Sequence, residues 1–191
     1  MKRLLALVLT LTVCLSFAGC GEGLEQLGQQ LGEMGQLMGD AMDGVQNPDQ
    51  EKTFTNNGAT LTLNTSFLDF TKTEKNAGEY AFLYANDSIG ILAIEENKQD
   101  LFAEFSEMDV QGYADLIAQL YTLGVTAEQK DGFWTYTYET TTDDVSQTFL
   151  CVFHETETAF WNIQSYCETE LYAENQEAMW KYLTSATFSA G

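Results

Sequence analysis

The chain has 191 residues, with 29 acidic and 8 basic side chains, a formal net charge of −21 and a single histidine. This balance excludes nucleic acid as a natural partner, because phosphate contacts need clustered lysine and arginine. The length suits one ordinary domain with its own core. No glycine-rich phosphate loop occurs in the chain, so we expect no cofactor.

The N-terminal segment, residues 1–19, begins with basic residues, continues with apolar residues and ends with residues that have small side chains. Two basic residues follow Met1, an apolar run extends from Leu4 to Phe17, and two small residues precede Cys20. The run is shorter than the ~20 apolar residues of a transmembrane helix. The segment resembles a bacterial lipoprotein signal peptide, with Phe17 where that family usually has leucine. The resemblance implies cleavage before Cys20 and lipidation of its thiol; ordinary secretion is the alternative.

Lipidation would place the protein on the extracytoplasmic face of the cell membrane, in the cell envelope. Each buried CH₂ of a fatty acyl chain such as palmitate contributes ~0.8 kcal/mol, so two chains anchor a protein stably. Removal of Lys2 and Arg3 leaves six basic residues against 29 acidic ones, a net charge of −23 with no arginine. Anionic lipid headgroups repel such a surface, so the lipid on Cys20 must make the membrane contact.

Residues 20–51 are expected to form a glycine-rich tether. Each glycine in a helix costs ~0.5–1 kcal/mol relative to alanine, which favours a frayed spacer. An amphipathic helix that self-associates or docks on the domain is the other interpretation, so the oligomeric state is left open. It rests on apolar residues at heptad spacing: Leu24, Leu27, Leu31, Met34, Met38, Ala41 and Val45.

A globular domain is expected over residues 52–191. Residues 54–61 predict a hairpin, because their central Asn57-Gly58 pair suits a type I′ turn. Two further strands are predicted at 79–85 and 88–96. A helix follows, with Asp109 as its N-cap and Gly124 near its end.

The second half of the domain predicts an aromatic strand, a hairpin and a final helix. These cover 133–139, then 147–155 paired with 158–167, then roughly 171–185. A turn between Glu155 and Thr158 would place Cys151 opposite about residue 162, some 17 Å from Cys167. A disulfide needs Cα atoms within ~7 Å, so we expect both thiols to be free and buried.

Several apolar stretches of the domain resemble small lipoproteins of the PsbP-like fold group, which includes a photosystem II extrinsic subunit and a Ran-binding import factor. The stretches are Gly58–Leu63 with Phe67, Phe160–Gln164 and Met179–Phe188. The resemblance implies an α+β domain in which two main helices pack on an antiparallel sheet of about six to seven strands. It implies no chemistry, because one fold hosts many functions.

Metal and nucleophilic chemistry lack the residues they need. Cys151 and His154 are three positions apart, so in one strand they face opposite sides and form no nucleophile–base pair. The mature domain has three cysteine and histidine side chains, fewer than the four of a tetrahedral zinc site. We therefore predict neither catalytic nor metal-binding residues, and a half-exposed strand position for His154.

The aromatic strand offers a candidate ligand surface. Trp134, Tyr136 and Tyr138 share one face of this strand, and Phe133 lies on the other. An exposed aromatic face binds sugar or peptide, whereas a covered one packs against the helices as core. The pattern favours core packing and keeps ligand binding as the alternative.

Together these features predict a non-enzymatic lipoprotein module that binds a protein or ligand at the cell envelope. The rival is a small-molecule binder, for sugar or peptide, or a hydrolase with a carboxylate-lined cleft; a third possibility is a structural spacer. A deep pocket holding an acid with a raised pKa would favour the rival.

Overall fold

The computed structural model describes residues 39, 40, 42, 44, 47–72, 78, 80–101, 108–142 and 144–189. The leader, Cys20 and the tether up to residue 38 lie outside the described residues. The compact unit that contains the domain begins at Asp40. No helix in the described ranges is long and apolar enough to cross a bilayer.

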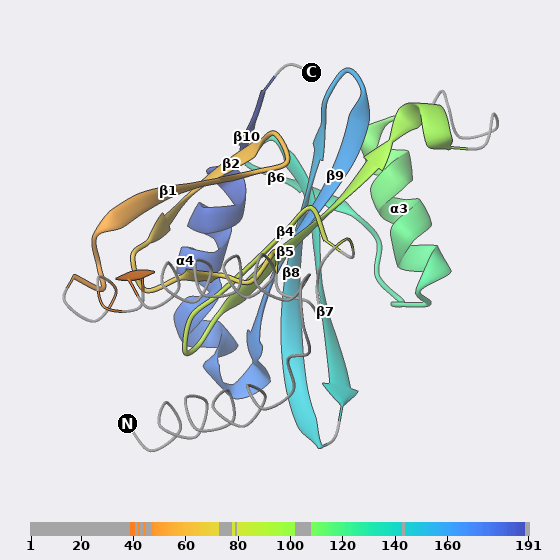
Figure 1. The fold of residues 1–191 in the computed structure, drawn as a ribbon. Helices are drawn as coiled ribbons and strands as arrows, with labels where there is room; N and C mark the ends of the chain where they lie inside the picture. The colour runs from red at the N-terminus through yellow and green to blue at the C-terminus, as the bar shows by residue number, and fades with distance from the viewer. Residues whose placement is uncertain are drawn as a thin grey trace, which may run out of the picture. The chain divides into compact units, whose positions relative to one another are not determined.

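The domain contains two antiparallel sheets and two main helices (Figure 1). The larger sheet has seven strands in the order β3-β4-β5-β9-β8-β7-β6. Its strands are β3 (Leu68–Asp69), β4 (Phe82–Ala85), β5 (Gly90–Asn97), β6 (Glu128–Lys130), β7 (Phe133–Thr142), β8 (Val145–Glu155) and β9 (Ala159–Glu168). The smaller sheet has the order β1-β2-β10, from β1 (Glu51–Asn56), β2 (Ala59–Asn64) and β10 (Thr187–Phe188). This architecture confirms the predicted α+β fold and adds a second sheet that the sequence did not indicate.

Local sequence signals explain the first hairpin and the first main helix. Asn57 and Gly58 both have positive φ, at 47° and 81°, as a type I′ turn requires. The helix α3 spans Val110–Leu120, and the Asp109 carboxylate accepts a 2.8 Å hydrogen bond from the Gly112 amide. Both predictions are confirmed, although α3 ends before Gly124.

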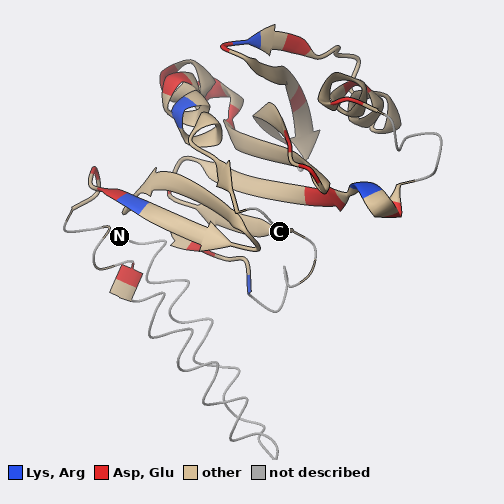
Figure 2. Cartoon of the chain, turned by 90° about the horizontal axis from the view of Figure 1, so that it is seen from above, with Lys and Arg blue, Asp and Glu red and all other residues tan. Residues whose placement is uncertain are grey.

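The second helix, α4, spans Tyr172–Thr184 and follows the 3₁₀ turn η4 (Thr169–Leu171). A second 3₁₀ turn, η2 (Lys98–Asp100), follows β5. In Figure 1, α3 and α4 lie on opposite sides of the seven-stranded sheet. Figure 2 shows acidic residues spread over both helices and several strand ends, with few basic residues among them.

Two separate hydrophobic clusters fill the two sides of the larger sheet. The larger cluster joins the sheet to α4 and the β1–β2 hairpin, and includes Leu61, Trp161 and Met179. The smaller one joins it to α3 through Tyr113, whose ring stacks on Phe160 with centroids 4.7 Å apart. Because Phe160 and Trp161 are neighbours in β9, one strand supplies both cores.

The β8–β9 hairpin has a register different from the predicted one. Glu155 pairs with Phe160, so Cys151 lies opposite Gln164 rather than about residue 162. Thr156 closes the turn, because its amide and hydroxyl both donate to the Ala159 carbonyl, at 2.9 and 3.1 Å. The predicted turn lies one residue too early, so each partner in β9 is shifted by two residues. This even shift leaves every side chain on its predicted face.

Candidate functional site

The predicted aromatic residues of β7 lie on the sheet face that carries α3. Tyr136 is buried, and its ring lies 5.1 Å from that of Phe153, between centroids. Trp134 and Tyr138 are half-buried and pack against the same cluster. The structure therefore brings all three to one face, where they extend the core beneath α3; binding of a ligand by these residues stays a prediction.

Beyond Tyr138, an aromatic row continues across the neighbouring strands. Tyr138 stacks on Phe149 with centroids 4.9 Å apart and rings 10° from parallel, and Phe149 stacks on Tyr166 at 5.1 Å and 23°. The register explains the row, because Tyr138, Phe149 and Tyr166 are direct cross-strand partners. Such aromatic pairs contribute ~0.5–1.5 kcal/mol beyond their buried area.

The row ends at a glycine. Gly90 of β5 is the partner of Tyr166, and a Cβ at position 90 would lie 2.2 Å from the Tyr166 Cζ atom. The absence of a side chain at Gly90 thus lets the tyrosine ring lie down over the next strand. The three rings therefore stack on one another, and the Tyr166 ring also covers the backbone of Gly90.

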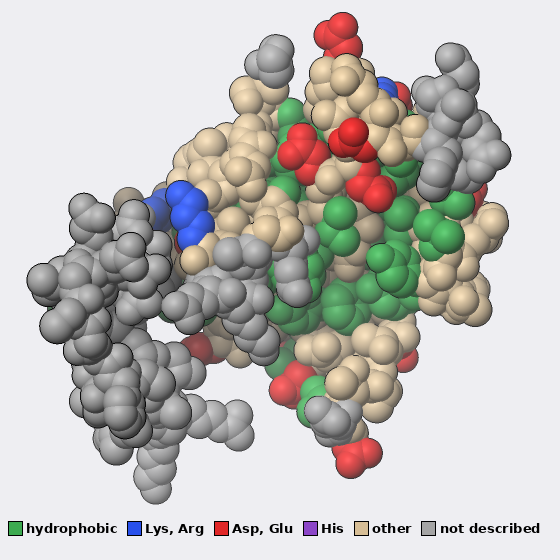
Figure 3. All heavy atoms as spheres, turned by 45° about the vertical axis from the view of Figure 1, so that its right-hand side comes forward, with side chains coloured by type: hydrophobic (Ala, Val, Ile, Leu, Met, Phe, Trp, Pro, Cys, Tyr) green, Lys and Arg blue, Asp and Glu red, His purple; other side chains and the backbone are tan. Residues whose placement is uncertain are grey.

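Half-buried apolar side chains surround this row, and together they form what we call the open face. The main described contacts of α3 with the sheet are to β7, β8 and β9, so α3 packs chiefly on one part of this side. Figure 3 shows hydrophobic side chains gathered here, with acidic ones above and below. The open face consists of Leu68, Leu83, Ala85, Leu92, Ile94, Tyr138, Phe149 and Tyr166.

Hydroxyl groups give the open face a polar element. The Tyr138 hydroxyl donates to Gln164 Oε1 at 3.3 Å, above the buried Cys151. Burial is the main cause that raises the pKa of Tyr138 and of Tyr166 above the usual value. Both phenols are therefore neutral at physiological pH, and the open face offers apolar surface and neutral hydrogen-bonding groups rather than charge.

The opposite side of the sheet has a groove of about 380 Å³ beside α4. Lys130 lies in it, with its ammonium 4.1 Å from the centre of the Trp180 ring. Glu128 and Glu177 line this groove, so it is the place in the described structure to which the carboxylate-lined cleft of the rival hypothesis would have to be assigned. The lining residues are Glu128, Lys130, Thr135, Thr137, Leu150, Tyr172, Gln176, Glu177 and Trp180.

Cys151 and Cys167, the two cysteines among the described residues, are free and buried, as predicted. Cys151 belongs to the cluster under α3, whereas Cys167 belongs to the other core, where its Sγ lies 3.8 Å from Met179 Sδ. Cys151 lies opposite Gln164, and Cys167 is three residues, roughly 10 Å, further along β9. The two thiols therefore lie on opposite faces of the sheet. Burial raises the pKa of the Cys151 thiol well above its usual value, so it is a poor nucleophile.

His154 lies on the α4 side, between the rings of Phe133 and Phe188, each 5.2 Å away between centroids. It is half-buried, as predicted, and faces away from Cys151. Burial lowers the pKa of His154 to about 4, against the smaller opposing effect of a hydrogen bond to the Leu183 backbone. The buried Nε2 atom has no hydrogen-bond partner, which suits a neutral ring. In the described part of the chain, no three histidine, cysteine or acidic side chains form a metal-binding group.

We expect His154 to make stability depend on pH. The folded pKa of about 4 lies below the unfolded value of ~6.5, so this contribution is complete above pH 6.5 and is lost as the pH falls toward 4. Between pH 7 and pH 5 the free energy of unfolding should fall by about 2 kcal/mol more in the wild type than in His154→Phe. Urea denaturation of both proteins at both pH values measures this difference, in which the carboxylates common to both cancel. Equal pH dependence in the two proteins would contradict it.

Comparison with known proteins adds information on the fold. No family model matches the sequence, and no curated protein matches it. The solution structure of cyanobacterial PsbP (CyanoP) from Synechocystis sp. PCC 6803 has a TM-score of 0.50 and 7% identity, over 73% of this chain and 93% of that one. A crystal structure from Bacteroides thetaiotaomicron gives 0.48 and 11%, over 74% of this chain, which spans about half (49%) of that one.

A third solved structure is LpqN, described as involved in cell envelope biogenesis of Mycobacterium tuberculosis. It has a TM-score of 0.43 and 12% identity, over 74% of this chain and 91% of that one. Identities this low bear on the fold alone. Together with the two helices and the seven-stranded antiparallel sheet, the CyanoP match shows that the domain has a PsbP-like α+β fold.

Proposed function

We propose that this chain is a non-enzymatic binding module, anchored through Cys20 to the extracytoplasmic face of the cell membrane, that holds a partner protein on its open face. The observation that carries the proposal is the half-buried row Tyr138–Phe149–Tyr166 on the part of the sheet that α3 leaves uncovered. Contiguous apolar patches on a soluble domain mark interaction sites, and aromatic residues are enriched among binding hot spots.

The geometry favours a protein over a sugar. A sugar stacks on the free face of an aromatic ring, whereas the faces between Tyr138, Phe149 and Tyr166 are already stacked on one another. Half-buried aromatic rings, aliphatic side chains and neutral hydroxyls suit the apolar side chains of a protein segment. The net charge of −21 favours a partner whose contact surface is basic around its apolar centre.

The experiment places a photo-crosslinking amino acid at Leu92, on the open face, in the full chain expressed in its own membranes. We expect a discrete crosslinked partner, and we expect Phe149→Ser in the same chain to remove it. Loss of one central aromatic anchor typically costs about 2 kcal/mol or more, roughly a 30-fold weakening. The matched control is Leu171→Ser, because Leu171 is 36% exposed and lies in η4, outside the open face.

The two variants separate binding from folding. Both variants replace a partly exposed apolar side chain by serine, and circular dichroism verifies that each chain remains folded. A crosslink that survives Phe149→Ser, or disappears equally in Leu171→Ser, would reject the open face as the binding surface.

A further inference from the structure

The groove beside α4 lies on the sheet face opposite the open face, so a ligand bound in it is independent of the proposed function. The two-residue turn at Asp131-Gly132, both with positive φ, closes the β6–β7 hairpin and pairs Lys130 with Phe133. Glu128 lies two residues before Lys130 and therefore on the same side of β6. The edge strand thus presents one cation and one carboxylate to the groove.

The opposite wall of the groove comes from α4. Tyr172, Gln176 and Trp180 are spaced by four residues, so they form one helix face, and Glu177 adjoins it. Phe133 meets the Trp180 ring edge-on, with centroids 6.2 Å apart and planes at 88°. This contact fixes the indole, and Lys130 occupies the indole face.

Lys130 differs from three lysines that form ion pairs in the described structure. Lys52, Lys98 and Lys181 each lie 2.6–2.7 Å from a carboxylate. Within the described residues Lys130 makes no such ion pair, and Glu128 and Glu177 of the same groove are also without one. The groove therefore combines an aromatic face that holds an ammonium group with two carboxylates that form no ion pair with any described residue.

We infer that this groove is a binding site for the ammonium group of a lysine side chain from a partner, and that Lys130 occupies its aromatic subsite when no partner is present. Trp180 supplies the cation–π contact and Glu128 and Glu177 supply the charge. The surrounding field of a chain with net charge −21 attracts the same ligand.

The test is a titration of the full chain, in detergent and labelled with ¹⁵N at tryptophan, with Nα-acetyl-lysine amide. Its three tryptophans give three indole N–H signals, and Trp180→Phe assigns one of them. We expect the Trp180 signal alone to shift in a saturable manner. Nα-acetyl-norleucine amide, which has the same chain without the charge, should not shift it.

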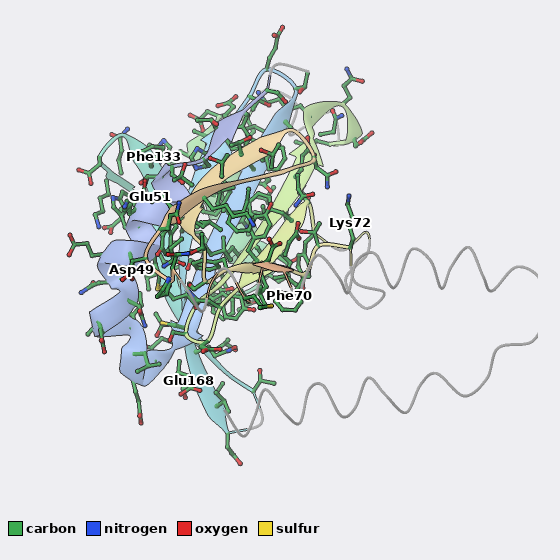
Figure 4. The ribbon with its side chains drawn as sticks, turned by 60° about the vertical axis from the view of Figure 1, so that its left-hand side comes forward. Asp49, Glu51, Phe70, Lys72, Phe133 and Glu168 are labelled. Carbon is green, nitrogen blue, oxygen red and sulfur yellow. The ribbon has the colours of Figure 1, made fainter. Side chains whose placement is uncertain are left out.

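Substitution of the internal occupant gives the sharper result. Lys130→Gln should bind the lysine probe roughly two- to five-fold more tightly. In the wild type the probe must first displace Lys130 from the Trp180 ring, and an exposed cation–π contact accounts for about this factor in affinity. The matched control is Lys72→Gln, which removes the same charge. Lys72 follows β3, the edge strand opposite β6, and Figure 4 shows it far from Phe133. This control should bind like the wild type, and Glu177→Gln in the Lys130→Gln chain should weaken binding again.

Three outcomes would overturn the inference. The norleucine probe could shift Trp180 as much as the lysine probe, Lys130→Gln could bind no more tightly than Lys72→Gln, or inorganic phosphate could shift Trp180 in the wild type but not in Lys130→Gln. The last result would assign the groove to anions held by Lys130.

Discussion

Cys20→Ala is expected to abolish lipid attachment and cleavage of the chain after Gly19. In the predicted signal the lipid is attached to the Cys20 thiol, which alanine lacks. Two acyl chains would supply most of the membrane affinity, at ~0.8 kcal/mol per buried CH₂. The acidic chain has no basic patch with which to bind anionic headgroups instead. Mass spectrometry of the detergent-extracted protein should find diacylglycerol on Cys20 of the wild type and a retained leader in the variant.

The leader also provides the control for this experiment. Cys14 lies within the apolar run, so Cys14→Ala should be processed and lipidated like the wild type. A wild-type chain that is soluble after cell fractionation, or that retains Met1 with an unmodified Cys20, would end the lipoprotein hypothesis.

Phe160→Ala and Trp161→Ala should each lower the free energy of unfolding by about 3–5 kcal/mol, the usual cost of truncating a buried aromatic side chain. Phe160 is 1% exposed and Trp161 is 3% exposed. The free energy of unfolding of a typical domain is about 5–15 kcal/mol, so either change removes a large part of the stability. Urea denaturation followed by circular dichroism measures the loss, and Leu120→Ala, at a site 67% exposed on α3, should change stability by less than ~0.5 kcal/mol.

These neighbouring residues also test the two cores separately. Phe160→Ala opens space against Tyr113, so hydrogen exchange should speed up in α3. Trp161→Ala opens space against Phe188, whose centroid lies 4.9 Å away, so exchange should speed up in the smaller sheet. Equal acceleration of both regions by both variants would show one cooperative core instead of two.

The sequence predicts those elements whose signals are local. Asn57-Gly58 identifies the first hairpin and Asp109 the start of α3, because turn and cap chemistry involve residues within a few positions. The third strand of the smaller sheet, β10, had no such signal. This strand has two residues and pairs Phe188 with Ala59, a contact that no periodicity over a short window indicates.

The candidate site was predicted only in part, and the register error explains why. With Cys151 opposite residue 162, Phe149 would face Gln164, and no aromatic row crosses the sheet. The observed register moves Tyr166 opposite Phe149 and completes the row from Tyr138. The groove was missed for another reason: Lys130 and Trp180 are distant in sequence and meet only because α4, which packs on β8 and β9, brings Trp180 beside the β6–β7 hairpin.

The pairing of Gly90 with Tyr166 has a consequence for the evolution of this chain. The ring occupies the space in which any side chain at position 90 would begin, so neither position can change freely on its own. A lineage that acquires a larger residue at 90 must first lose the ring at 166, which leaves the Gly90 backbone uncovered for a time. In the reverse order the new side chain would clash with the ring. Across orthologues the two positions should therefore covary, with loss of the tyrosine as the permissive step.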